Sequence, residues 1–174
     1  MSSWTKPCSY SAILEAIVAQ IGASDVLSRN GLVKSAPGIV SDAWLKKEKV
    51  PNSGGAFVGL GRVSSVKQLA DGTSVHELGL GVFLVPPYRR RDGQAASIAD
   101  TAHRLIELID DNRFELAKAQ RPVGISARNL YSPSVDLLGS ALWLIEWRQS
   151  FILFDAEGND IGNAASRSAA LGRG

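Results

Sequence analysis

The sequence predicts an α+β fold, in which a small mixed or antiparallel sheet packs against two helices. Two apolar runs, Ala56–Val66 and Val75–Val85, alternate as strands do and are joined by the turn pair Asp71-Gly72. A stretch with helical periodicity follows at Gln94–Phe114, and a long aromatic strand is predicted from about Ala141 to Phe154. This order of elements favours a sheet that is backed by helices.

A first helix is predicted near the N-terminus. Ile13, Ile17 and Ile21 are spaced four residues apart and therefore share one helical face, while Gly22 is a suitable stop. A serine just before this run can cap the helix by accepting a hydrogen bond from a free backbone N–H.

Residues 30–55 are rich in glycine and proline and predict a long loop, which can hold a short strand near Gly38–Leu45. Lys46, Lys47 and Lys49 form a small basic cluster in this segment. We interpret the cluster either as a solvated loop or as a contact with an acidic partner, and we count its lysines among the interface candidates.

The hairpin has a predicted core face and a face that carries glycines. Leu78, Leu80, Val82 and Leu84 fall on one side of the second strand, and this side is the better candidate for the core. The glycines at 59, 61, 79 and 81 form two Gly-x-Gly patterns inside strands. A dinucleotide site needs such glycines at a strand-to-helix turn, so the pattern does not indicate nucleotide binding.

The last strand is predicted to supply large side chains to the core or to an interface. Trp143, Ile145, Trp147 and Phe151 share one of its faces, on which Gln149 is the polar exception. We interpret the two tryptophans as core or interface aromatics. Stacking on a base or sugar is the alternative.

A basic elbow, Pro86–Gly93, lies between the hairpin and the second helix. Pro86-Pro87 ends the strand because proline has no N–H to donate to the ladder. Arg89, Arg90 and Arg91 then form a run that can contact phosphate groups, pair with carboxylates of a neighbouring subunit, or remain solvated.

After the second helix, Leu116–Ser126 is expected to be a loop, and Arg128–Tyr131 can form a short strand. The Gly-, Ala- and Ser-rich end of the chain loses apolar periodicity and is expected to be flexible. We therefore expect one domain over residues 1–154, with the long loop at 30–55, and an extension over 155–174.

Composition is that of a globular domain, with 45% hydrophobic and 21% charged residues, and the net charge of +2 does not suggest a dedicated nucleic-acid binder. A single cysteine, Cys8, excludes an internal disulfide and is compatible with a reducing cytosol. The first residues lack the apolar region of a signal peptide, and no apolar run approaches the roughly 18 residues that span a membrane. We expect a protein made in a cytoplasm, without a membrane partner.

The residues do not predict an enzyme. The serines lack a nucleophile-elbow setting, and His76 and His103 are the two histidines available as bases. One cysteine and two separate histidines give no ligand spacing for a metal. We therefore assign no catalytic, cofactor-binding or metal-binding residue and expect no cofactor.

The layout resembles that of the tail terminator, or tail completion, proteins of long-tailed bacteriophages. The resemblance covers roughly Ser11 to Phe154 and is carried by the hairpin strands, the Arg89–Arg91 elbow, the Gln94–Phe114 helix and the Trp143–Leu153 strand. It is a likeness of element order and includes no diagnostic motif. The loop around 30–55 and the C-terminal extension depart from the shorter family members.

The resemblance implies a virion protein of the tail or neck, assembled in the host cytoplasm. Such proteins form a homohexameric ring that caps the tail tube, ends its polymerisation and offers its other face to the connector of the head. Double-stranded DNA passes through the lumen without specific binding. Other functions that we consider are another neck or head–tail connector protein, a tail tube subunit and a small nucleic-acid-binding protein.

Overall fold

The computed structural model describes residues 4–27, 31–36, 42–48, 50–51, 53–85, 94–130, 142–155 and 158–160. These residues form an α+β fold with two longer helices, one short helix and a five-stranded mixed sheet, which confirms the predicted class. The elements are, in chain order, α1 (Tyr10–Ala23), β1 (Leu32–Ser35), α2 (Asp42–Lys47), β2 (Gly55–Gln68), β3 (Ser74–Val85), α3 (Gln94–Ile109), β4 (Val123–Asn129) and β5 (Trp143–Ile152).

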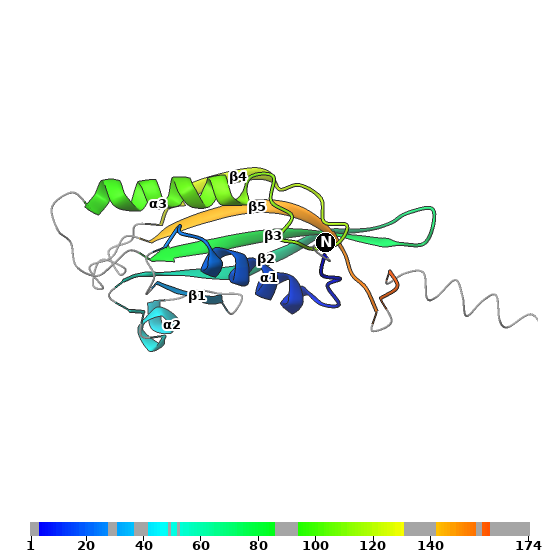
Figure 1. Cartoon of the computed structure of the whole chain (residues 1–174), viewed down its shortest axis with the longest axis horizontal. Helices are drawn as coiled ribbons and strands as arrows, with labels where there is room; N and C mark the ends of the chain where they lie inside the picture. Colours follow the sequence, from blue (N-terminus) through cyan, green and yellow to red (C-terminus); the bar gives the residue numbers. More distant parts are fainter. Residues whose placement is uncertain are drawn as a thin grey trace, which may run out of the picture.

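The strands are arranged in the order β1-β2-β3-β5-β4 (Figure 1). β1 runs parallel to β2, and all other neighbours are antiparallel. The predicted hairpin is present, with Asp71 and Gly72 in its turn. Gly72 has a φ of 86°, which glycine adopts without strain, and the side chain of Asp71 accepts a hydrogen bond from the Thr73 N–H at 2.9 Å.

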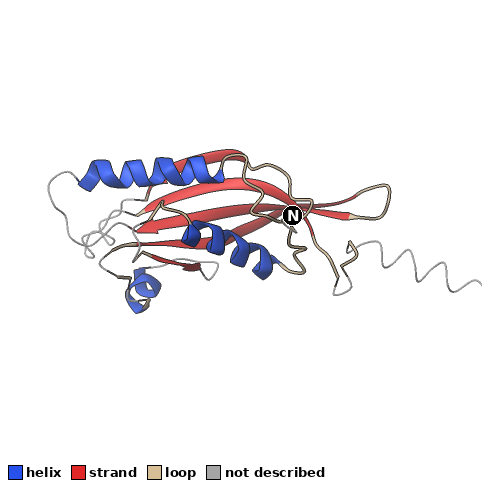
Figure 2. Ribbon diagram, in the orientation of Figure 1, coloured by secondary structure: helices blue, strands red, loops and turns tan. Residues whose placement is uncertain are grey.

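Helices α1 and α3 cover the same face of the sheet (Figure 2). Helix α1 begins after Ser9, whose hydroxyl accepts the Ala12 N–H at 3.1 Å, and it buries the three isoleucines that the spacing predicted. Helix α3 buries Ile98, Ala102, Leu105 and Ile109, which follow helical spacing. Each large aliphatic side chain buried here contributes about 1.5–3 kcal/mol relative to an exposed one.

The strand face beneath these helices is the face that alternation assigned to the core. Leu78, Leu80, Val82 and Leu84 of β3 are each at most 2% exposed. On β5, Ile145, Trp147 and Phe151 join the same cluster, and Trp143 is partly buried against it. The core therefore lies between the sheet and the two longer helices.

The segment predicted as a long loop at 30–55 instead contains β1, α2 and the start of β2. In the region where a strand near Gly38–Leu45 was considered, the described residues form the helix α2, and residues 37–41 lie outside the description. Trp44 of α2 packs edge-on against Phe57, with the ring centroids 5.0 Å apart. This contact anchors α2 to a small second core on the other face of the sheet.

The connection after α3 also differs from the prediction. The helix ends at Ile109 instead of Phe114, because Asp111, Phe114 and Glu115 all have φ between 52° and 58° and cannot continue a right-handed helix. The strand expected at Arg128–Tyr131 begins earlier, at Val123, so the last four residues of the predicted loop belong to β4.

The described end of the chain is attached to the body. Phe154 forms a bridge with Asp160, and the Asp160 carboxylate pairs with the Lys118 ammonium at 2.8 Å. The first residues of the extension at 155–174 are therefore held by contacts, and residues 161–174 lie outside the description.

Candidate functional site: an open sheet face and an unpaired strand edge

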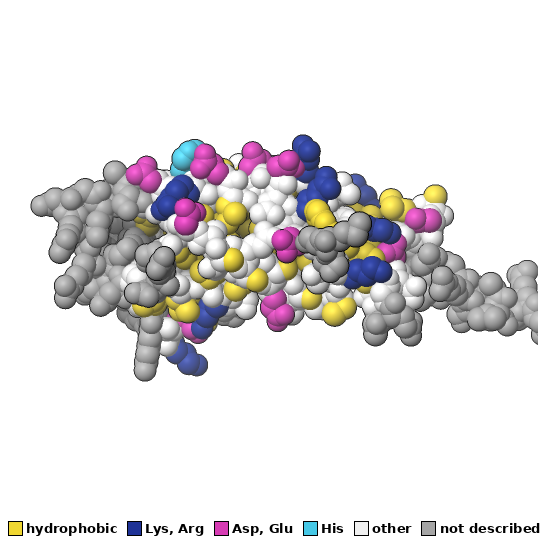
Figure 3. Space-filling view, in the orientation of Figure 1, with side chains coloured by type: hydrophobic (Ala, Val, Ile, Leu, Met, Phe, Trp, Pro, Cys, Tyr) yellow, Lys and Arg dark blue, Asp and Glu magenta, His cyan; other side chains and the backbone are white. Residues whose placement is uncertain are grey.

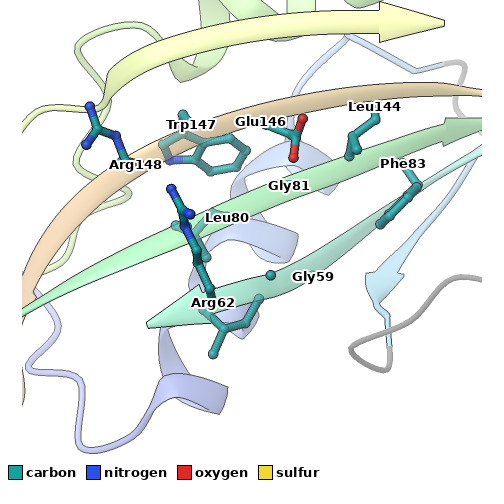
Figure 4. Close-up of a pocket in the computed structure, with 12 residues that line it drawn as sticks. Gly59, Arg62, Leu80, Gly81, Phe83, Leu144, Glu146, Trp147 and Arg148 are labelled. Carbon is teal, nitrogen blue, oxygen red and sulfur yellow. The ribbon is translucent and has the colours of Figure 1, made fainter. Parts of the chain in front are cut away.

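The sheet face opposite α1 and α3 carries a groove of about 370 Å³ beyond the second core. Its floor includes the strand glycines Gly59, Gly61, Gly79 and Gly81, and Phe83 and Leu144 lie at one end (Figure 4). Because side chains alternate along a strand and paired residues share a face, Gly59, Gly79 and Gly81 lie on the face that points away from the helices. The glycines leave this part of the sheet without the cover that larger side chains would give.

Not all of these glycines are needed for the same reason. A Cβ on Gly79 would lie 2.9 Å from Cγ of Arg62, and one on Gly81 would lie 3.1 Å from a methyl group of Leu144. A Cβ on Gly59 would meet its nearest atom only at 3.9 Å. Gly61 lies where the β2–β3 register shifts, so it takes up an irregularity in the strand.

Charged side chains cross the open face in adjacent rows. Arg62 of β2, Gly79 of β3 and Arg148 of β5 lie in one cross-strand row, so the glycine separates two arginines. Figure 4 shows Arg62 extending from β2 across β3, with Arg148 extending from β5. Arg148 pairs with Glu77 at 3.8 Å, whereas Arg62 has no ion pair within the described part of the chain.

A second ion pair joins Arg128 of β4 to Glu146 of β5 at 3.3 Å. The side chains of Arg128 and Glu146 are 63% and 46% exposed, so this pair contributes at most about 1 kcal/mol to stability. Such charges orient a partner or set specificity more than they stabilise the fold.

The outer edge of β2 is unpaired over much of its length. β1 pairs only with Gly55–Val58, and a last hydrogen bond from the Ala36 N–H reaches the Val58 carbonyl at 2.7 Å. β2 continues to Gln68 with β3 on its other side, and no further strand borders its outer edge among the residues described. The edge therefore presents free N–H and C=O groups from about Gly59 onward.

The unpaired part of β2 and the turn that follows it expose large apolar side chains. Val63, Val66 and Leu69 are 43%, 55% and 48% exposed. This end of the hairpin extends beyond the helices in Figure 1, and Figure 3 shows hydrophobic side chains there on the surface. A long strand edge with exposed apolar groups is a surface that pairs readily with another strand.

The site residues expected from the sequence lie in several different parts of the chain. Ile145, Trp147 and Phe151 lie inside the core, and Trp143 lies at its margin. Arg89, Arg90, Arg91 and Lys49 lie outside the described residues; Lys46 lies in α2 but its side chain is not described, and Lys47 is exposed. Lys47, in α2, is thus the one predicted interface cation whose side chain the structure describes.

The sequence did not predict that Arg62 and Arg148 lie in the same cross-strand row, on either side of Gly79. The alternation did place Glu77 and Arg148 on strand faces away from the predicted core. The pairing order of the strands, which brings β5 beside β3, was needed to show that these positions are neighbours.

Each of the two histidines lies beside another side chain of the same subunit. Nδ1 of His76 lies 2.8 Å from the Tyr10 hydroxyl, Nε2 is buried without a partner within the described region, and burial lowers the pKa of the ring. His103 is exposed on α3 and lies 3.5 Å from Glu107.

Across the described ranges, no three His, Cys, Asp or Glu side chains gather where they could hold a metal ion, and no helix is long and apolar enough to cross a membrane.

Comparison with known proteins adds no family to this description. No protein-family model matches the chain, and no curated protein sequence matches it. The fold and site define an α+β domain with an open, charged sheet face and a projecting, unpaired hairpin edge. The functional argument therefore depends on this geometry.

Proposed function

We propose that the protein is a structural component of a bacteriophage tail: a ring that caps the tail tube, stops its polymerisation and joins the tail to the connector of the head. The observation that carries the proposal is the projecting β2 edge with its exposed valines and leucine. A subunit that exposes both strand hydrogen-bonding groups and apolar side chains at one end is suited to docking against other proteins.

The layout that resembles tail terminators supports the same conclusion. The helix, the hairpin, the second helix and the long aromatic strand follow one another in the chain. In this proposal the partners are five further copies of the chain, the tube protein and a neck protein of the connector. The protein belongs to the tail or neck of the virion, and assembly takes place in the host cytoplasm.

The arginine elbow has a defined place in this proposal. Arg89–Arg91 follow the end of β3 at Val85, which lies at the opposite end of the hairpin from its turn. We propose that these arginines face either the lumen or the next subunit. Contacts with DNA in the lumen would be made to phosphates and would carry little sequence preference.

A small nucleic-acid-binding protein is the second candidate, and the open face gives it one specific observation. Arg62 and Arg148 flank Gly79 on a surface with room for a ligand. Glu77 and Glu146 lie on the same face and pair with two of its arginines, which reduces the attraction for a polyanion. We therefore favour the structural proposal.

Electron microscopy of the purified protein, alone and mixed with tail tubes, tests the proposal. We expect closed rings on one end of each tube. Open filaments of the protein alone would favour a tube subunit. A monomer that ignores tubes would contradict the proposal, and salt-sensitive DNA binding by that monomer would support the second candidate.

A further inference from the structure

We propose that neighbouring subunits of the ring join by antiparallel strand pairing, in which the outer edge of β2 at Leu60–Lys67 binds the outer edge of β4 at Val123–Asn129 of the next copy. The inference rests on the proposed ring and adds its contact surface. Two unpaired edges of this chain carry it, together with the directions of the strands between them.

The first edge is the outer half of β2. Its backbone groups have no strand partner beyond the reach of β1, which ends at Val58 in the ladder. Val66 is 55% exposed on the part of this edge that no described helix covers. Strand addition would satisfy the backbone groups and bury the apolar side chain in one step.

The second edge is the outer side of β4, the last strand of the sheet. β4 pairs with β5 on one side, and its other side has no strand partner in the described part of the chain. Val123 at its start is 49% exposed. β4 has seven residues, and the free part of β2 from Gly59 to Gln68 is long enough to pair with all of them.

The strand directions allow these edges to meet in a ring. From β2 through β3 and β5 to β4, each neighbour is antiparallel, so β2 and β4 point in opposite directions. A rotation about an axis in the general direction of the strands leaves the sense of each strand unchanged. The next copy therefore offers β4 antiparallel to β2, and the contact uses two different surfaces, as a closed ring requires.

The register gives a consistent geometry. Through β5 and β3, Asn129 of β4 is level with Ala56 of β2, and Val123 is level with Arg62. β1 occupies the beginning of β2, so the neighbour must be displaced along the strand to reach the free half, and a displacement of four ladder positions keeps each side chain on its own face of the sheet. Four positions rise about 13 Å and four strands span about 19 Å, which corresponds to a strand inclination of about 35°, at the lower end of the range for closed sheets.

This displacement places specific residues opposite one another. Counted in ladder positions, with the bulges of both strands included, Ala127 of one copy faces Val63 of the next, and Val123 faces Lys67. Ser126 therefore faces Ser65. Ser65 pairs with Glu77 and Ser126 pairs with Glu146 within the subunit, so both serines belong to the open face of the sheet.

A cross-linking experiment tests the contact directly. The exposed Cys8 is first replaced by serine, and Ser65→Cys is then combined with Ser126→Cys. We expect mild oxidation of the ring to give covalent multimers up to the full ring. The control pair, Ser65→Cys with Asn129→Cys, is offset by three residues, or about 10 Å, which a disulfide does not bridge.

A second variant tests the edge without cross-linking. Val66→Lys places a charge on the proposed interface, and we expect the ring to dissociate to folded monomers with an unchanged circular dichroism spectrum. Trp4→Lys is the matched control, because Trp4 is 47% exposed and belongs to neither β2 nor β4, and its replacement is expected to leave the ring intact.

The outcomes separate this inference from the proposed function. Rings that persist in Val66→Lys and give no Ser65–Ser126 cross-link would overturn the strand contact while leaving a capping ring in place. Absence of any ring from the unmodified protein, with or without tubes, would overturn the proposed function and this inference together.

Discussion

Gln149→Leu perturbs the buried polar group that connects the core to the loop after α3. The Gln149 side chain is 1% exposed, and its oxygen accepts the Trp147 Nε1–H at 3.1 Å. Its nitrogen donates to the carbonyls of Asn112 at 3.0 Å and Gln120 at 2.8 Å. Leucine has a similar volume and replaces none of these bonds.

The structure gives the expected magnitude. A buried polar group that loses its partner costs about 1–3 kcal/mol. The full cost applies to the indole N–H, because Trp147 is 2% exposed. The two carbonyls belong to residues that water can reach, so their loss costs less. We expect Gln149→Leu to lower the free energy of unfolding by about 2–4 kcal/mol.

Urea denaturation followed by tryptophan fluorescence measures this change. Gln120→Leu makes the same replacement at an exposed position and is expected to change stability by less than about 0.5 kcal/mol. Trp147→Phe removes the N–H donor, so the double variant with Gln149→Leu should show a coupling of about 1 kcal/mol. A Gln149→Leu protein as stable as the unmodified chain would refute the role given to this network.

Three further predictions concern the core, the partly buried His76 and the strand glycines. Trp147→Ala is expected to cost about 3–5 kcal/mol of unfolding free energy, and Trp143→Ala less, because Trp143 is only partly buried. Burial lowers the pKa of His76 below 6.5, so the unfolded chain binds a proton at a higher pH than the folded chain does. Stability should therefore be lost as the pH falls below about 6.5, and His76→Phe should reduce this dependence of stability on pH. Gly55→Ala would place Cβ 2.8 Å from the Leu32 carbonyl and is expected to cost about 1–3 kcal/mol, whereas Gly59→Ala has room and should be neutral or slightly stabilising.

Each of these has a result that would count against it. Equal losses for the two tryptophans, measured by denaturant unfolding, would show that the core is misassigned at one of them. For the histidine, stability is measured between pH 7 and pH 5 with His103→Phe as the exposed control, and an unchanged slope in His76→Phe would exclude the ring as its source. If Gly55→Ala and Gly59→Ala melt at the same temperature, the close approach of β1 to Gly55 is wrong.

Strong periodicity explains why most of the fold could be predicted. The isoleucines of α1 and the leucines of β3 repeat at the spacing of their elements, and Asp71-Gly72 marks the hairpin turn. The short elements could not be predicted in the same way. β1 has four residues and α2 has six, so neither is long enough to show a clear periodic pattern, and each is held by its packing on β2.

The candidate site depended on contacts that one strand alone does not specify. The position of Arg62 opposite Gly79 follows from the register shift at Gly61, which no local pattern indicates. Gln149 stood out as a polar residue among apolar ones, but its partners Asn112 and Gln120 come from another part of the chain. The free half of β2 became visible only with the short reach of β1.

The growth of tail tubes in the presence of this protein tests the central claim most directly. Phage tail tube protein is allowed to polymerise, and growth is followed by light scattering while the protein is added at increasing ratios. We expect elongation to stop once there is one ring per growing tube end, and Val66→Lys to require much more protein for the same effect. Elongation that continues at its original rate at saturating protein would contradict the account.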